Sequence, residues 1–131
     1  MRFIALPCCL SLALAAGCAT DDTATPEISD LTATPSTMKV GQQATVTGTL
    51  HFDDADGDLS TLDGEITMPD GTKAALRSTD VTAIGAMTTG TLSWAMIVVP
   101  PSAGSYTLTL WVTDADGHES NRLETTATAA P

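Results

Sequence analysis

The sequence predicts an all-β protein, an antiparallel β-sandwich of about seven strands. Three observations lead to this fold class. Apolar and polar residues alternate along most of the chain after residue 27, and turn-forming residues interrupt the alternation about every 8–12 residues. No segment carries the 3.6-residue apolar stripe of an amphipathic helix. The chain has 131 residues, 43% of them hydrophobic, so it can bury the core of one such domain.

The first half of the domain should contain three long or medium strands and a weaker one. The weaker strand is expected over residues 28–34, and strict alternation follows over residues 44–52 and 62–68. Pro69, Asp70 and Gly71 then form a typical tight turn, because Pro fixes φ and Gly accepts a positive φ. Residues 72–77 should return from that turn as the next strand.

The second half should contain three more strands. Residues 92–98 alternate and place Trp94 on the inward face, where it should fill the core. Pro100 and Pro101 end this strand, because Pro has no N–H to donate to a neighbouring strand. Residues 106–112 alternate again, and residues 123–128 form a last, weaker strand.

One segment carries a resemblance to known domains. Residues 103–117 read AGSYTLTLWVTDADG. They resemble the penultimate strand and following turn of bacterial immunoglobulin-like, PKD-like and fibronectin-like domains, and Tyr106 matches the tyrosine-corner position. Residues 26–35, followed by Val40-Gly41-Gln42, look like the first strand and corner of such domains. The resemblance implies an immunoglobulin-like sandwich. It has no disulfide, because all three cysteines lie at or before position 18.

The first 18 residues predict export. Arg2 precedes an uncharged run over residues 3–17, which is shorter than the roughly 20 residues of a membrane-spanning helix but fits a secretory signal. The run ends in Leu14-Ala15-Ala16-Gly17-Cys18, which resembles the lipobox of bacterial lipoproteins, although the usual Leu three residues before the Cys is Ala15 here. The resemblance implies cleavage after Gly17 and a lipid on Cys18. The alternative is cleavage after Ala15, which would release a secreted protein with one unpaired thiol.

These features predict three parts. Residues 1–17 are a lipoprotein signal peptide, residues 18–26 are the lipidated Cys18 and a flexible tether, and residues 27–131 are the immunoglobulin-like domain. Asp directly after the lipidated Cys is associated with inner-membrane retention, and Ala19 stands there instead. The lipoprotein resemblance therefore implies an outer-membrane or cell-surface location on a bacterial envelope.

Two acidic segments are expected to meet at one end of the sandwich, because the loop after the second strand and the loop before the last strand emerge at the same pole of an immunoglobulin-like fold. Carboxylate oxygens are the ligands that Ca²⁺ prefers. The alternative is that these aspartates only form turns, since Asp-Gly sequences are common turn formers and the spacing does not match an EF-hand. The candidate Ca²⁺ ligands are Asp53, Asp54, Asp56, Asp58, Asp114, Asp116 and Glu119.

Composition argues against several functions. A formal charge of −11 disfavours nucleic acid as a partner. No nucleophile motif or phosphate-binding loop occurs, and His51 and His118 are expected to be surface residues, so we expect no enzyme. Trp111 falls on the polar face of its strand; it is either a contact for a glycan or an envelope protein, or a residue covered by a neighbouring side chain.

The sequence therefore favours a non-enzymatic, membrane-anchored extracytoplasmic module with a structural or adhesive role. The alternative function is a Ca²⁺-dependent or carbohydrate-binding module that uses the acidic loops or Trp111.

Overall fold

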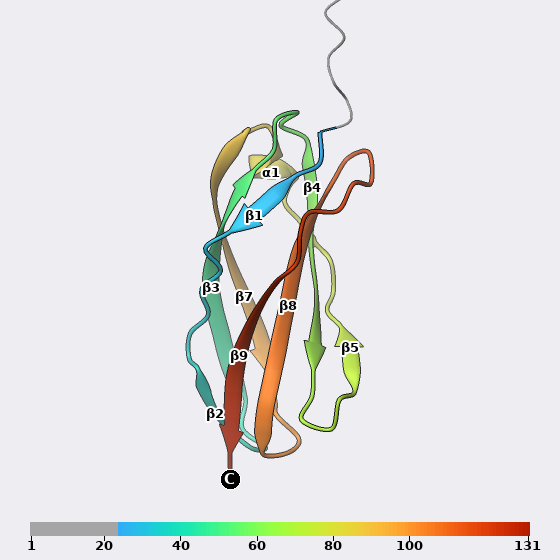
Figure 1. Cartoon of the computed structure of the whole chain (residues 1–131). Coiled ribbons are helices and arrows are strands. Elements are labelled where there is room, and N and C mark those ends of the chain that lie inside the picture. Colours follow the sequence, from blue (N-terminus) through green and yellow to red (C-terminus); the bar gives the residue numbers. More distant parts are fainter. Residues whose placement is uncertain (1–23) are drawn as a thin grey trace, which may run out of the picture.

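The computed structural model describes residues 24–131, so the predicted signal peptide and the predicted lipidation site Cys18 lie outside the described residues. Two sheets pack face to face (Figure 1). The smaller sheet has the order β1-β3-β7, and the larger has the order β2-β9-β8-β4-β5, with β6 also paired to β4. The described elements are β1 (Glu27–Ser29), β2 (Thr37–Lys39), β3 (Ala44–Asp53), β4 (Leu59–Thr67), β5 (Lys73–Ala75), β6 (Thr79–Asp80), α1 (Thr82–Gly85), β7 (Thr89–Val98), β8 (Gly104–Asp114) and β9 (Leu123–Ala130).

The long strands lie where the alternation predicts them, and their apolar residues form the core between the sheets. Leu50 and Phe52 of β3 are fully buried, and so is Val112 of β8. Trp94 of β7 is 8% exposed, which confirms its predicted inward position. Its ring lies over Gly48 of the neighbouring strand, where a Cβ atom would be only 2.5 Å from the ring.

Three short elements differ from the predicted arrangement. The first strand is only Glu27–Ser29, and the chain then crosses to the other sheet, where β2 pairs with β9. This pair is parallel, because β2 reaches the edge of the larger sheet running in the same direction as β9. The prediction that all strands pair antiparallel is therefore wrong for β2. The helix α1 was not predicted, since its four residues are too few to show helical periodicity.

The connections confirm two of the expected turns. Gly71 has φ +86°, and the N–H of Met68 donates to the carbonyl of Thr72 across the predicted tight turn. Tyr106, near the start of β8, is buried, and its hydroxyl donates to the carbonyl of Ser102 in the connection from β7 at 2.8 Å. This bond is the local closure that a tyrosine corner provides.

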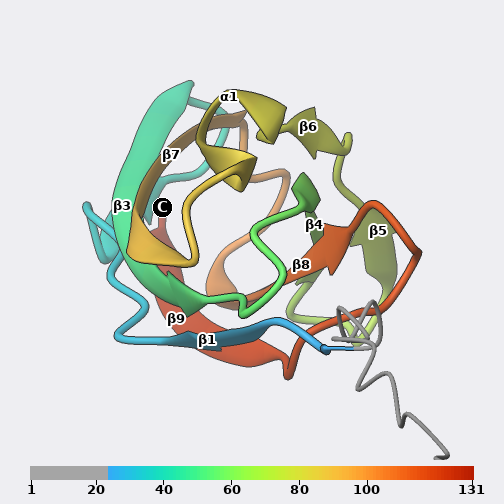
Figure 2. The ribbon, with the colours of Figure 1, turned by 90° about the horizontal axis from the view of Figure 1, so that it is seen from above.

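The sandwich has two distinct ends. The loops at residues 54–58 and 115–122 lie at one end, called the acidic pole below, and Figure 2 looks down on it. The loops at residues 40–43, 68–72 and 99–103 lie at the opposite end, called the distal pole. The described chain begins at the acidic pole and ends at the distal pole (Figure 1).

The strand β1 is held from both sides. Ile28 pairs with Phe52 of β3, and its side chain is buried in the core. On the other side, the N–H of Ile28 donates to Asn121 Oδ1 at 2.8 Å, and Asn121 Nδ2 donates to the carbonyl of Ile28 at 2.9 Å. The Asn121 side chain therefore joins the smaller sheet to the larger one.

Candidate functional site

The two acidic loops meet at the acidic pole, as the strand order predicts. Leu59, which begins β4, pairs with Asp114, which ends β8. The N–H of Ala115 also donates to the carbonyl of Asp58 at 2.9 Å. Each loop turns at a glycine with positive φ, +63° at Gly57 and +90° at Gly117. Left-handed backbone of this kind favours glycine, which explains the Asp-x-Asp-Gly sequence of both loops.

In the first loop, two carboxylate oxygens are buried without a donor. Asp54 is 1% exposed, and its Oδ2 accepts the N–H of Asp58 at 3.0 Å. Its Oδ1 has no hydrogen-bond partner among the described residues, and the same holds for Oδ1 of Asp58. A buried carboxylate oxygen without a donor or a cation costs free energy, so this loop has unsatisfied capacity for a positively charged ligand.

In the second loop, by contrast, the carboxylate is fully used. Asp114 is 3% exposed, and it accepts the N–H groups of Asp116 at 3.0 Å and His118 at 2.7 Å. His118 Nδ1 lies 2.8 Å from Asp114 Oδ2. Burial raises the pKa of Asp114, but these hydrogen bonds and the charge of His118 outweigh it, so the pKa lies below its ordinary value. The same bond and the negative charge of Asp114 raise the pKa of His118.

Negative charge from both loops converges on Asp58. Burial raises the pKa of this carboxyl, and repulsion from four other carboxylates raises it further. These four are, in decreasing order of effect, Asp114, Asp54, Asp116 and Asp56.

Two of the seven predicted ligands stand apart from this group. The carboxylate of Asp53 lies 3.5 Å from His51 Nε2, and Glu119 pairs with Arg122 at 3.4 Å. Among residues 24–131, no three His, Cys, Asp or Glu side chains gather around one point as a metal ion requires. Metal binding at the acidic pole therefore stays a prediction, and it would need the loops to close further.

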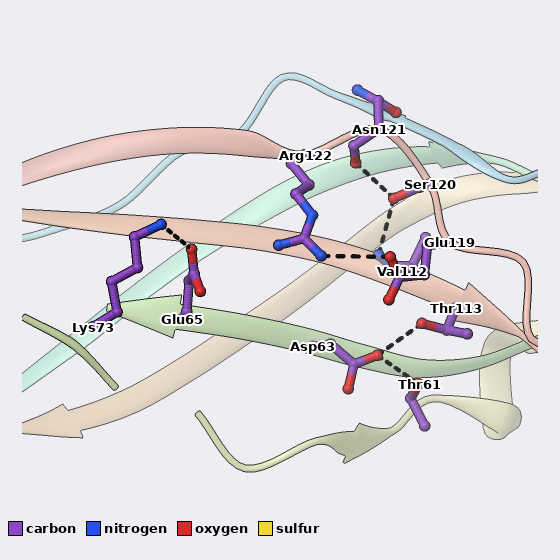
Figure 3. Close-up of polar contacts among 10 residues, drawn as sticks. All are labelled: Thr61, Asp63, Glu65, Lys73, Val112, Thr113, Glu119, Ser120, Asn121 and Arg122. Atoms are coloured by element: carbon purple, nitrogen blue, oxygen red, sulfur yellow. Dashed lines mark hydrogen bonds and ion pairs between the residues drawn. The ribbon is translucent and has the colours of Figure 1, made fainter. Parts of the chain in front are cut away.

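Trp111 lies on the outer face of the larger sheet and is half-buried. The guanidinium of Arg122 sits over its ring, 3.8 Å from the ring centroid, within the range of a cation–π interaction. Arg122 also pairs with Glu119 (Figure 3). A long neighbouring side chain thus covers Trp111, which is the second of the two predicted alternatives. A sugar ring could stack on this face only by displacing the guanidinium.

A polar network on the same face was not predicted. The carboxylate of Asp63 accepts hydrogen bonds from Thr61 at 2.7 Å and Thr113 at 2.9 Å (Figure 3), and from the Ser78 hydroxyl. Burial raises the pKa of Asp63, but these three bonds outweigh it and the pKa is lowered. Both carboxylate oxygens accept from neighbouring hydroxyls, so the network has a structural explanation. The residues that donate to Asp63 lie in three separate segments of the chain, and the sequence pattern does not indicate that these segments meet.

No helix in residues 24–131 is both long and apolar enough to cross a membrane. No protein-family model matches the chain, and no curated protein matches it in sequence. Several solved structures are similar in fold. A β-glucosidase from Erythrobacter marinus matches with a TM-score of 0.52 at 9% identity, over 82% of this chain and 16% of that one.

Two further similar structures are smaller proteins. The PKD domain of an M14-like peptidase from a Thermoplasmatales archaeon matches with a TM-score of 0.48 at 16% identity, over 82% of this chain and 94% of that domain. A superoxide reductase (neelaredoxin) from Ignicoccus hospitalis matches with a TM-score of 0.48 at 11% identity, over 81% and 80% of the two chains. At such identities only the fold is shared, and the fold is an immunoglobulin-like β-sandwich.

Proposed function

We propose that this protein is a non-enzymatic interaction module, held on a bacterial envelope by a lipid on Cys18. The observation that carries the proposal is the way the chain enters the sandwich. The N–H of Ala24 donates to Asp56 at 3.2 Å, so the described chain starts on the acidic pole. Cys18 precedes Ala24 by six residues, which span at most about 20 Å. A lipid there would hold the acidic pole near the membrane and present the distal pole outward.

The histidines support a role without catalysis. His51 is the one described histidine with a hydroxyl beside it, since Thr89 Oγ1 lies 3.3 Å from its Nε2. The Asp53 carboxylate approaches the same nitrogen. A nucleophile–histidine–aspartate relay needs its two partners on opposite ring nitrogens, so this arrangement does not activate Thr89. His118 already pairs with the buried Asp114.

Metabolic labelling with an alkyne fatty-acid analogue in a bacterial host tests the anchor. The full-length protein should take up label and sediment with membranes, and Cys18→Ala should lose both properties. Cys9→Ala is the matched control, because Cys9 lies in the segment that is removed. Equal labelling of Cys18→Ala and the wild type would refute the anchor, and so would a wild type without label.

A second candidate function is Ca²⁺ binding at the acidic pole, favoured by the unpartnered Oδ1 atoms of Asp54 and Asp58. Ca²⁺ takes six to eight oxygen ligands at about 2.3–2.6 Å, so both loops would have to draw their carboxylates together around it. Binding would remove the repulsion on Asp58 and stiffen the pole.

Thermal unfolding of the chelator-treated Cys18→Ala protein, with and without Ca²⁺, tests this function. A site occupied at 100 times its Kd would stabilise the fold by about 2.7 kcal/mol. Asp54→Asn should abolish the Ca²⁺ effect, whereas Asp53→Asn should keep it, because Asp53 faces His51 instead. An unchanged melting temperature in millimolar Ca²⁺ would exclude the site.

A further inference from the structure

The smaller sheet ends in an open strand edge. The strand β7 pairs with β3 over ten consecutive residue pairs without a register shift, from Thr89 to Val98. The chain before it does not cover its other side, because β5 and β6 both pair with β4 in the larger sheet. Among residues 24–131, no strand lies on that outer edge of β7. Its outward N–H and C=O groups are therefore free to pair with another strand.

This edge lacks the features that usually prevent strand pairing. Natural edge strands carry charged residues, proline or bulges. The sequence of β7 is TGTLSWAMIV, without a charged residue or a proline, and its register has no bulge. Large apolar side chains are exposed where β7 ends, with Ile97 of the strand 66% exposed and Val99, just after it, 54% exposed. The edge is therefore competent to accept an added strand over residues 91–97, the part of β7 that borders the groove described next.

An apolar groove runs beside the same edge. Its volume is about 620 Å³, within the range of ligand pockets. Both the inward-facing Trp94 and the outward-facing Ala95 of β7 border it, so the groove is continuous with the strand edge. The opposite wall comes from β4, α1 and the chain between β5 and α1. The apolar side chains of that wall are Leu62, Leu76, Val81, Ala83 and Ile84.

We propose that β7 and this groove bind an extended peptide segment of another protein as a fourth strand of the smaller sheet. The backbone of the peptide would pair with β7, and every second side chain would enter the groove. Apolar residues at alternate positions suit the groove, and polar residues suit the opposite face. The inference deepens the proposed interaction module by naming its partner chemistry, and it does not depend on the anchor.

Charge and shape favour such a peptide over a second copy of this chain. Asp63 and Asp80 border the groove against a single Arg77, and the chain carries a formal charge of −11. Basic residues at the ends of the peptide would complement this field. A second copy would add another −11, and its own β7 has its inward side chains in its own core, so it could not fill the groove.

Calorimetric titration of the Cys18→Ala protein with a designed peptide tests the proposal. The probe is an end-blocked nonapeptide, Lys-Val-Thr-Val-Thr-Val-Thr-Val-Lys, and saturable 1:1 binding is expected. Two control peptides carry N-methyl groups, either on the three Thr or on the inner Val residues. In a strand, alternate N–H groups face the same neighbour, so only one of the two controls should lose binding. Absence of binding, or equal binding by all three peptides, would overturn strand addition.

Two protein variants test whether the peptide binds in the groove. Ala83 and Ala86 are both exposed, but only Ala83 borders the groove. Ala83→Arg should weaken binding at least tenfold, because the long basic side chain blocks the groove and repels the lysines. Ala86→Arg should bind like the parent. Equal affinity in both variants would mean that the peptide binds elsewhere. Far-UV circular dichroism checks that both variants fold.

A fluorescence measurement gives an independent readout. In a Trp111→Phe background, Trp94 is the one remaining tryptophan, and because it borders the groove, a bound peptide should change its emission. An unchanged emission at saturating peptide would contradict occupation of the groove. Light scattering tests whether a second copy of this chain occupies the edge instead. If the protein is a dimer in solution and Ala95→Lys dissociates it, the chain itself pairs at this edge and the proposal is wrong.

Failure of these experiments would leave the lipid anchor untouched. Fatty-acid labelling of Cys18 does not involve β7, and peptide binding is measured without the lipid. Peptide binding without labelling would retain the interaction module but remove its anchor.

Discussion

Gly48 is the residue on which the packing of the core depends most directly. A Cβ atom there would overlap the carbonyl oxygen of Thr32 and approach the Trp94 ring to 2.5 Å. We expect Gly48→Ala to lower the free energy of unfolding by about 1–3 kcal/mol or more through overpacking. Trp94→Ala should cost about 3–5 kcal/mol by leaving a cavity in the same place. Urea denaturation of the Cys18→Ala protein measures both values.

The control for Gly48→Ala lies on the same strand. Thr47 is exposed, and its side chain points away from the core. Thr47→Ala should change the free energy of unfolding by no more than about 0.5 kcal/mol. If Gly48→Ala were as mild as this control, the ring of Trp94 would not lie against Gly48.

Asp58 and Asp114 should respond to pH in opposite ways. The pKa of Asp58 is raised in the fold, so its ionised form destabilises the protein at neutral pH, and this penalty disappears as the pH falls through the raised pKa. Asp58→Asn should therefore raise the melting temperature at pH 7 by about 2–3 °C, equivalent to roughly 0.5 kcal/mol at this half-buried site after allowing for solvent screening. Below the ordinary value of 3.8, where the carboxyl is protonated in both the folded and the unfolded state, the variant and the wild type should melt together.

Asp114→Asn provides the contrast. The pKa of Asp114 is lowered in the fold, so its stabilising contribution is present above its ordinary value of 3.8 and is lost as the pH falls through the folded pKa. The His118 pKa is raised, so the contribution of its charge is present below 6.5 and is lost as the pH rises through the folded pKa. Asp114→Asn should lower the melting temperature at pH 7. Shifts of the same sign for both variants would show that the two loops are not electrostatically distinct.

At the scale of elements, the connection between β7 and β8 depends on Tyr106. Removing its hydroxyl deletes the donor of the part-buried hydrogen bond to the carbonyl of Ser102. Tyr106→Phe should cost about 1 kcal/mol or slightly more. Ser102→Ala is the matched control, because it keeps the backbone carbonyl that accepts the bond. Chemical denaturation should rank the two variants in this order, and equal stability would mean that the corner bond contributes nothing.

The long strands could be predicted because ten or so alternating residues carry a clear period, as in β3 and β8. The short ones could not, since β6 is only Thr79–Asp80 and both residues are exposed. The alternation of apolar and polar residues also does not predict the path of the chain before β7. Val81 is buried, and its N–H donates to the carbonyl of Ser60, which draws this segment toward β4 and leaves β7 open. Whether this segment lies against β4 or β7 therefore depends on the packing of single residues such as Val81, which sequence periodicity does not reveal.

The acidic pole was predictable in part. Strand order alone brings the two loops together. It does not tell which carboxylates converge, because that depends on the residue at which β3 ends. Asp53 is the last residue of the strand and faces outward, while Asp54 turns inward and is buried. A boundary one residue away would exchange their roles, since side chains alternate between the two faces of a strand.

At the scale of the whole molecule, the proposed anchor fixes an orientation. The two poles are separated by the length of β3, ten residues or about 33 Å. A fluorophore on Ala115→Cys, at the acidic pole, should be strongly quenched by quencher-labelled lipid headgroups in liposomes that carry the lipidated protein. The same fluorophore on Ala103→Cys, at the distal pole, should be quenched little. Equal quenching of both labels would contradict this orientation.

The double hydrogen bond from Asn121 to Ile28 has a mechanical consequence. A pull between a lipid on Cys18 and a peptide bound along β7 would enter the sandwich through β1, which has three residue pairs with β3. Because the chain enters β1 from the acidic pole and β1 lies alongside β3, a force directed along the strands loads these bonds together in shear. Asn121 shares that load with the larger sheet. The hydrogen bonds at Ile28 should therefore determine the force at which the module begins to unfold, by detachment of β1.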